Sequence, residues 1–174
     1  MTIIYISLPY FADCDFPLVK ELRKQGCRII HIIPITPKYL KSTLIEIEQQ
    51  YPHNGIFKAN IYKEIAQYSE YINDDTYVIN RTYASKSIIK KIISSYKLYK
   101  FISSFNYNYV WTSLPFGITD LLLYNLKNII LTVHDPFPHT GESNLRRTLI
   151  EKIAYKRCKK FILLNNKQLT PFIN

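Results

Sequence analysis

The first 33 residues predict a strand, a helix and a second strand in immediate succession, and this order constrains the fold more than any other feature of the chain. Residues 2–8 form a nearly continuous run of β-favouring apolar residues. Residues 15–25 carry apolar residues at helical spacing with Asp15 as the expected N-cap, and residues 27–33 form a second apolar run that we expect to stop at Pro34. Uninterrupted apolar runs are typical of strands that are covered on both faces, as in parallel sheets. We therefore expect a right-handed βαβ unit at the N-terminus.

Strands and helices continue to alternate along the rest of the chain. The apolar and periodic segments predict strands at 76–80, 108–113, 128–133 and 160–164, and helices at 39–50, 61–72, 85–105, 116–126 and 143–158. Such alternation indicates an α/β fold, and we expect a doubly wound, mainly parallel Rossmann-like sheet with helices on both faces. At this length we expect residues 1–174 to form a single domain.

The composition excludes the glycine-rich phosphate loops. The chain has only 4 glycines and contains neither a GxGxxG nor a GxxxxGK[ST] motif. The backbone cradle that holds a dinucleotide or a P-loop phosphate in other proteins is therefore missing.

The cysteines and the apolar segments indicate in which cellular compartment the chain is expected. Cys14, Cys27 and Cys158 show no C-x-x-C spacing, which argues against a disulfide framework or a structural zinc site and favours a reducing compartment. No basic segment precedes the first apolar run, and polar residues interrupt the longest charge-free stretch, so we expect neither a signal peptide nor a membrane span. We predict a cytoplasmic protein that can attach peripherally to the inner face of the membrane.

Polar residues gather where the predicted strands end. In a doubly wound sheet, ligands bind outside the carboxyl ends of the strands, at the point where the strand order reverses. If the first strand is central, these ends place Tyr10, Thr112 and Ser113 around one crevice, together with His134 and Asp135. We expect the imidazole of His134 to emerge from the sheet into an open groove.

His134 begins the most informative segment, in which two prolines stiffen a loop that also carries His139 and Glu142. An imidazole at the end of a strand donates or accepts a hydrogen bond near neutral pH, which suits contact with sugar hydroxyls or a phosphate. A structural histidine bonded to a neighbouring carbonyl is the alternative. A zinc or manganese site built from His134, Asp135, His139 and Glu142 is less favoured, because the prolines prevent the helix on which H-x-x-x-H ligands lie.

The run from Thr132 to Glu142, TVHDPFPHTGE, followed by a basic helix and the apolar segment 161–164, resembles the N-terminal domain of family 4 retaining glycosyltransferases. Members of that family have the GT-B architecture, in which two Rossmann-like domains face each other across a cleft. The resemblance implies that His134 lies at the cleft and contacts the donor sugar, which makes it the candidate catalytic residue. It also implies that Asp135 and the loop after it face the acceptor. The substrate-binding candidates are Asp135, His139, Glu142, Tyr10 and Arg147.

By this resemblance, the chain is the acceptor-side domain of a transferase that moves a sugar from a nucleotide-sugar donor to a glycan or lipid-linked acceptor. The second domain, which binds the nucleotide sugar in that family and supplies a pair of glutamates, has no counterpart in these 174 residues. We therefore expect the isolated chain to be inactive, and we expect no metal ion or other cofactor. Two alternatives stay open: a stand-alone Rossmann-like module that binds a glycan or a nucleotide, and a basic adaptor for membrane surfaces.

Positive charge is concentrated on two predicted helices. The chain carries 23 Lys and Arg against 13 Asp and Glu, a formal net charge of +10. In the helix over 85–105, four lysines share one arc of about 80°, and we expect the apolar face opposite them to pack on the sheet. The lysines are Lys86, Lys90, Lys97 and Lys100, and the residues opposite are Ile88, Ile89, Ile92, Tyr96 and Tyr99. The lysine face is either simply solvated or attracted to an anionic membrane surface.

The second concentration spans residues 146–167, where eight basic residues stand against Glu151 alone. Arg147 is the candidate for contact with a phosphate, because it follows the His134 loop within one turn of the predicted helix start. A nucleic-acid partner is not expected, because the chain has neither an RNP-like aromatic run nor a GXXG loop.

Overall fold

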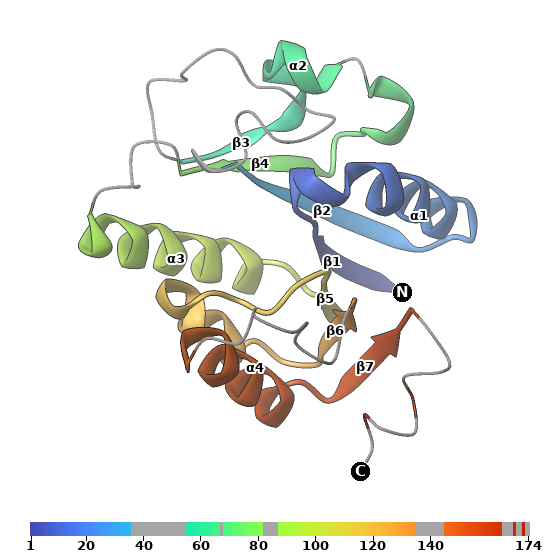
Figure 1. The fold of residues 1–174 in the computed structure, drawn as a ribbon. Coiled ribbons are helices and arrows are strands. Elements are labelled where there is room, and N and C mark those ends of the chain that lie inside the picture. Colours follow the sequence, from blue (N-terminus) through green and yellow to red (C-terminus); the bar gives the residue numbers. More distant parts are fainter. Residues whose placement is uncertain are drawn as a thin grey trace.

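Seven strands form one sheet in the computed structural model, which describes residues 1–35, 55–66, 68–81, 87–134, 145–164, 169 and 172 (Figure 1). The strands are β1 Thr2–Ile6, β2 Arg28–Ile35, β3 Gly55–Lys58, β4 Thr76–Asn80, β5 Tyr109–Thr112, β6 Ile129–Val133 and β7 Lys160–Leu163. Their order is β3-β4-β2-β1-β5-β6-β7, and every neighbouring pair is parallel except β3 and β4. The parallel strands, numbered along the chain, lie in the order 3-2-1-4-5-6 of dinucleotide-binding folds, with the reversal between β1 and β5.

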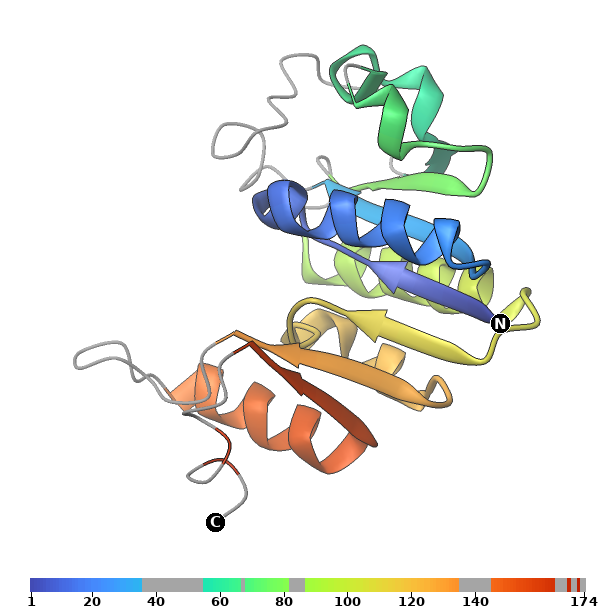
Figure 2. The same cartoon turned by 90° about the vertical axis from the view of Figure 1, so that its right-hand side faces the viewer.

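Helices cover both faces of this sheet, as Figure 2 shows from the side of α1. Helix α1 (Ala12–Lys24) lies across β1 and β2 on one face, whereas α3 (Ile88–Ser103), the 3-10 helix η6 (Ile118–Asn125) and α4 (Leu145–Arg157) cover the other. The short helices are η1 Pro9–Phe11, η3 Ala59–Ile61, α2 Lys63–Ala66 and η4 Ser69–Tyr71. The predicted fold class, a doubly wound and mainly parallel Rossmann-like sheet, is confirmed. Within the described ranges, no helix has the length and apolar character needed to cross a bilayer.

The isoleucine-rich strands β1 and β2 supply both halves of the core. Successive side chains of a strand point to opposite faces, so Ile4 and Ile6 pack on the side of α3, whereas Ile3 and Tyr5 pack against α1. The register places Tyr5 opposite His31, so β2 divides its side chains between the same two faces. Burial on both faces explains why these two strands have nearly uninterrupted apolar sequences.

Strand β2 continues through Pro34 and ends at Ile35, beyond its predicted end. The pairing of β1 with β2 stops where Ile6 lies opposite Ile32, so Pro34 pairs only with Ile79 of β4. A proline, which has no N–H to donate, is tolerated where a strand has a neighbour on one side only. The prediction that this strand stops at Pro34 is therefore wrong, because pairing with β4 extends it.

The middle of the chain differs most from the prediction. Three short helices, η3, α2 and η4, take the place of the single helix predicted at 61–72, and η6 is a 3-10 helix. The sequence predicts no strand at β3, which pairs antiparallel with β4 at the edge of the sheet. The helix predicted at 39–50 lies outside the described residues. Weak local periodicity leaves the structure of such segments to tertiary contacts.

Helix α3 packs through a face other than the predicted one. Its buried side chains are Ser94, Ser95, Leu98 and Ile102. The hydroxyl of Ser95 donates to the carbonyl of Lys91 at 3.0 Å and also to Asp120 of η6, so the helix approaches η6 closely. The prediction that the isoleucine face packs on the sheet is wrong: Ile88, Ile89, Ile92 and Tyr96 are exposed, and of the predicted residues only Tyr99 is packed against the core. The apolar periodicity of the sequence correctly indicated a stripe of isoleucines on α3, but it did not indicate which side of the helix packs against the sheet.

A histidine is buried between α1 and the sheet. Ser7 Oγ lies 2.6 Å from His31 Nε2, and both side chains are inaccessible to solvent. The other ring nitrogen, Nδ1, has no hydrogen-bond partner among the described residues. Burial lowers the pKa of His31, and together with the nearby charge of Arg23 it brings the pKa to about 3. The ring is therefore neutral over the physiological range.

A carboxyl group lies in the same layer. Asp15, the expected N-cap, is instead buried within the first turn of α1, because η1 runs directly into α1 and Phe11 takes the N-cap position. Its Oδ1 accepts a hydrogen bond from the Tyr5 hydroxyl at 2.7 Å, and its Oδ2 accepts one from the Ser113 hydroxyl at 2.7 Å. Burial raises the pKa of Asp15 to about 6, although the hydrogen bonds from Tyr5 and Ser113 oppose the rise. The carboxyl thereby ties β1, α1 and the end of β5 together.

His31 predicts a loss of stability in acid. Its pKa is lower in the folded state than the unfolded value of about 6.5, so its contribution to stability is complete above about pH 6.5 and is lost as the pH falls toward 3. In the variant His31→Gln, which keeps a polar partner for Ser7 but does not titrate, this loss disappears. Urea unfolding at a series of pH values measures it. Parallel stability curves for wild type and variant between about pH 6.5 and pH 4 would contradict the assignment.

Asp15 predicts a loss of stability as the pH rises, which is the opposite pH dependence to that of His31. Its pKa is higher in the folded state than in the unfolded chain, so the contribution of this group is most favourable below the unfolded pKa of about 4 and is lost as the pH rises through 6. Asp15→Asn removes the titration but keeps an acceptor for Tyr5 or Ser113. We expect the stability of the variant relative to wild type to rise by on the order of 2 kcal/mol between pH 4 and pH 7. An unchanged difference over that range would show that the carboxyl is not buried as described.

Candidate functional site

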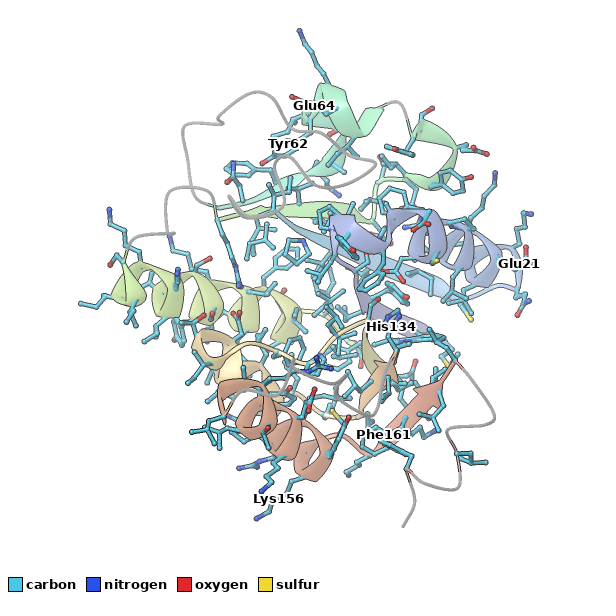
Figure 3. The ribbon with its side chains drawn as sticks, viewed as in Figure 1. Glu21, Tyr62, Glu64, His134, Lys156 and Phe161 are labelled. Atoms are coloured by element: carbon cyan, nitrogen blue, oxygen red, sulfur yellow. The ribbon has the colours of Figure 1, made fainter. Side chains whose placement is uncertain are left out.

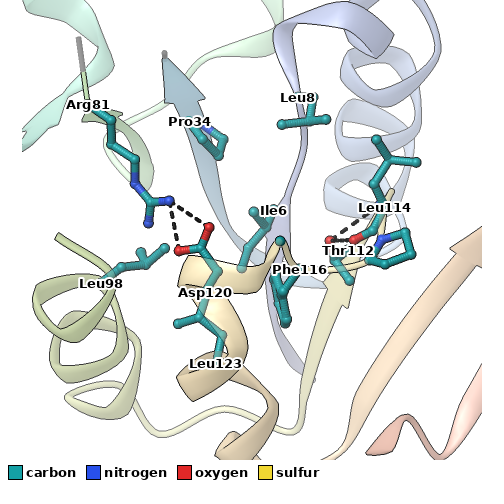
Figure 4. A pocket seen from close by; sticks show the side chains of 12 residues that line it. Ile6, Leu8, Pro34, Arg81, Leu98, Thr112, Leu114, Phe116, Asp120 and Leu123 are labelled. Atoms are coloured by element: carbon teal, nitrogen blue, oxygen red, sulfur yellow. Dashed lines mark hydrogen bonds and ion pairs between the residues drawn. The ribbon is translucent and has the colours of Figure 1, made fainter. Parts of the chain in front are cut away.

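A pocket opens at the carboxyl edge of the sheet, where the loops after β1, β4 and β5 meet (Figure 4). This is the point where the strand order reverses, which is where doubly wound sheets bind ligands. Its volume is about 250 Å³. The lining residues are Ile6, Leu8, Pro34, Arg81, Leu98, Thr112, Leu114, Pro115, Phe116, Gly117, Asp120 and Leu123.

One ion pair provides the charge of the pocket. The backbone N–H of Arg81 donates to Ile35 O at 2.8 Å, so the sheet ladder fixes the start of this side chain just beyond β4. Its Nη1 donates to both carboxylate oxygens of Asp120, at 2.8 Å and 3.0 Å (Figure 4). Only 12% of the Arg81 side chain and 16% of the Asp120 side chain are exposed. Solvent screens exposed ion pairs and weakens them, but this pair is largely buried, so its attraction is stronger and holds the two side chains together.

The Arg81 guanidinium is only partly satisfied by these contacts. Nε and Nη2 are buried and have no hydrogen-bond partner among the described residues. An unpaired buried donor costs roughly 1–3 kcal/mol, and more when it belongs to a charged group. Nε and Nη2 lie on one edge of the planar guanidinium, which is the edge that binds carboxylate or phosphate oxygens bidentately. Arg81 therefore lines the pocket with a guanidinium whose Nε–Nη2 edge is buried in the wall and has no hydrogen-bond partner among the described residues.

The rest of the pocket is mostly apolar. Leucine, isoleucine, proline and phenylalanine side chains form its walls, and the hydroxyl of Thr112 is bound to its own loop, donating to Leu114 O at 2.7 Å. Tyr124 holds the backbone of Phe116 in place, because the Phe116 N–H donates to the Tyr124 hydroxyl at 2.9 Å. Apolar walls with a few polar groups are typical of small-molecule sites.

His134 directly follows β6 and points to the face of the sheet that carries α1 (Figure 3). Its ring is half-buried and is stacked on Phe11, with ring centroids 4.2 Å apart and an interplanar angle of 11°. Burial lowers its pKa, and a hydrogen bond with the Ser113 backbone opposes this shift. Nε2 is buried and has no partner among the described residues. Instead of emerging into an open groove, the ring is covered on one side by the loop after β1.

The structure brings one other predicted residue to His134. Tyr10 is exposed, and its ring meets Phe11 edge-on at a centroid distance of 5.2 Å, so Phe11 links it to the histidine. Arg147 lies on α4, on the other side of the sheet from α1, and its Nε donates to Glu151 at 2.8 Å. No described contact joins Arg147 to His134. The roles assigned to these residues from the sequence stay predictions.

Asp135, His139 and Glu142 lie outside the described residues. The zinc or manganese alternative needed these three residues beside His134, so the structure does not test it. In the part of the chain that the structure describes, no three His, Cys, Asp or Glu side chains gather closely enough to hold a metal ion.

Arg81 and Asp120, which charge the pocket, were missed by the sequence analysis. They are 39 residues apart in the chain, and nothing in the sequence links them. One signal was available: Arg81 is the first charged residue after a predicted strand, and strand ends are where ligand contacts occur in this fold class. The clustered polar residues after β6 form a stronger local pattern in the sequence than this single arginine.

Comparisons with known proteins are sparse. No protein-family model matches the sequence, and no curated protein matches it. Among solved structures, the chain is similar to the crystal structure of the SurE protein from Aquifex aeolicus, with a TM-score of 0.40 and 9% sequence identity. The aligned region covers 94% of this chain and 66% of that chain. A likeness this distant carries no inference about activity.

These findings correct the resemblance to family 4 glycosyltransferases and the sugar-transfer function drawn from it. A chain of that family is expected to match its family model, but no family model matches, and a solved structure found to be similar is the SurE protein. The resemblance rested on one short segment, most of which lies outside the described residues. Doubly wound folds host many unrelated activities, so agreement in fold did not support the family assignment.

Proposed function

We propose that this chain is a Rossmann-like binding module for a phosphorylated small molecule of the mononucleotide class, held in the pocket between the ends of β1 and β5. The observation that carries the proposal is the Arg81 guanidinium, buried at the switch point with Nε and Nη2 unpartnered among the described residues. Asp120 holds the guanidinium in place through Nη1 and makes no hydrogen bond to that edge.

The chemistry of the pocket supports this class of ligand. Two parallel N–H donors on one guanidinium edge match two oxygens of a phosphate group. The apolar walls supplied by Leu8, Leu114 and Phe116 suit the uncharged part of the ligand, such as a base. A neutral sugar offers this edge only hydroxyl groups, whereas a phosphate offers two anionic oxygens, and this favours a nucleotide over a glycan.

The size of the pocket limits which ligands of this class can fit. A volume of about 250 Å³ lies below the roughly 300–1,000 Å³ of common small-molecule pockets. The chain also lacks the GxGxxG loop that cradles a dinucleotide pyrophosphate. Both observations favour a ligand with one nucleoside and a short phosphate group.

Binding measured by calorimetry with adenosine and uridine 5′-monophosphates tests the proposal. Arg81→Gln removes the charge and the bidentate edge, and we expect the affinity to fall at least tenfold, because a hydrogen bond to a charged group contributes about 1.5–3 kcal/mol. Adenosine without phosphate should bind at least tenfold more weakly to wild type for the same reason.

The matched control is Arg28→Gln. Arg28 begins β2 at the amino edge of the sheet and pairs with Asp75, so its loss removes the same charge far from the pocket. We expect this variant to bind as wild type does. Equal weakening by the two substitutions, or a wild type that binds neither nucleotide, would overturn the proposal.

The ion pair itself predicts a stability effect. Asp120→Ala leaves the Arg81 charge buried without a counter-ion, and this should destabilise the fold by about 3 kcal/mol. The double substitution Arg81→Met with Asp120→Leu removes both charges and should cost less than the sum of the single changes. Urea unfolding of Asp120→Ala, of the double variant and of its two single variants, Arg81→Met and Asp120→Leu, measures these differences. Additive costs would indicate that the two side chains do not interact.

A further inference from the structure

The exposed face of α3 is unusually apolar for a surface helix. Ile88, Ile89, Ile92, Ile93 and Tyr96 are 68%, 70%, 51%, 49% and 53% exposed. At 100° per residue these five side chains fall within one arc of about 140°. Single exposed apolar residues are common on protein surfaces, but a contiguous stripe indicates an interaction site.

The opposite arc of α3 already has its partners. Ser94, Ser95, Leu98 and Ile102 are buried against the sheet and η6. The helix therefore cannot rotate to bury the isoleucine stripe without exposing Leu98 and Ile102. Within the described part of the chain, nothing covers the stripe, because its five residues keep about half or more of their surface exposed.

Lysines border the stripe, and the helix has no acidic residue to balance them. Lys90 and Lys97 lie along one edge of the stripe and Lys100 lies one turn further on, whereas Lys91 lies on the arc of the buried residues. Lys86, the remaining predicted lysine, lies outside the described residues. Lys90 and Lys97 also line a groove of about 170 Å³ together with Ile93 and with Gly55 of β3. Positive charge and apolar surface thus occupy the same side of one helix.

We propose that α3 docks on an anionic lipid surface, with its axis in the plane of the interface, the isoleucines entering the acyl boundary and the lysines meeting the headgroup phosphates. An exposed helix with an apolar stripe and flanking lysines has the pattern of interfacial helices. Each lysine near an anionic leaflet adds about 1 kcal/mol of attraction, and the net charge of +10 adds a favourable long-range field.

The extent of the stripe favours a lipid surface over a protein partner. A stable protein interface involves roughly 20–30 residues on each side, whereas this stripe has five apolar residues and its bordering lysines on one helix. A bilayer has no such requirement, since a few inserted side chains and several lysines together suffice for reversible attachment. The proposal is independent of the nucleotide pocket.

Co-sedimentation with vesicles tests the docking. We expect the protein to bind vesicles of equal parts phosphatidylcholine and phosphatidylglycerol and not vesicles of phosphatidylcholine alone, because the lysines need anionic headgroups. Ile89→Ser with Ile92→Ser should lower the partition coefficient about tenfold or more, because apolar insertion is lost. Lys90→Gln with Lys97→Gln should lower it by about fivefold for each lysine and reduce its dependence on salt.

The matched control is Ile61→Ser with Lys63→Gln, which removes one exposed isoleucine and one exposed lysine from η3 and α2, away from α3. This variant should bind vesicles nearly as wild type does, and circular dichroism should show that all variants are folded. Binding that is unchanged by both α3 variants overturns the proposal, as does binding lost equally in the control. Self-association of wild type in sedimentation velocity that Ile89→Ser with Ile92→Ser abolishes, without vesicle binding, would assign the stripe to a second copy of the chain instead.

Discussion

Strands β1 and β2 lie side by side at the centre of the sheet, and their isoleucines face α1 on one side and α3 on the other. Apolar burial on both faces stabilises only a parallel arrangement with helices on each side, so this pair sets the direction of the remaining parallel strands. It also determines where the carboxyl ends of β1, β4 and β5 meet. Because Arg81 and Thr112 stand at those ends, the pocket at the switch point is a direct consequence of how the two central strands are buried.

Buried polar groups in this fold divide into two kinds by how completely they are partnered. Asp15 accepts hydrogen bonds on both carboxylate oxygens, from Tyr5 and Ser113, so it needs no further group and acts as a structural tie. Arg81 is different, because Asp120 satisfies Nη1 while Nε and Nη2 have no partner in the described ranges. A charged donor left unpaired is costly, and a bound anion would recover that cost. Incomplete pairing therefore separates the candidate site from the structural network.

Helix α3 connects the two surfaces for which we propose partners. On its buried side, Ser95 donates to Asp120, and Asp120 in turn positions Arg81 in the pocket. On its exposed side, the isoleucine stripe and the lysines face solvent. In the first half of the helix, Ser94 and Ser95 face the protein whereas the isoleucines face solvent, which reverses the usual arrangement of a surface helix. This reversal is why the exposed stripe calls for an explanation in terms of a partner.

The sequence by itself determined the fold class, because uninterrupted isoleucine-rich runs separated by helical segments are compatible with few other arrangements than a doubly wound parallel sheet. It predicted the middle of the chain less well, because the periodicity is weak at η3, α2 and η4. Only the tertiary structure decided which arc of α3 is buried and that Arg81 meets Asp120, since both depend on contacts between segments far apart in the chain. It also covered the His134 ring with Phe11, a contact between residues 123 positions apart that no local pattern encodes.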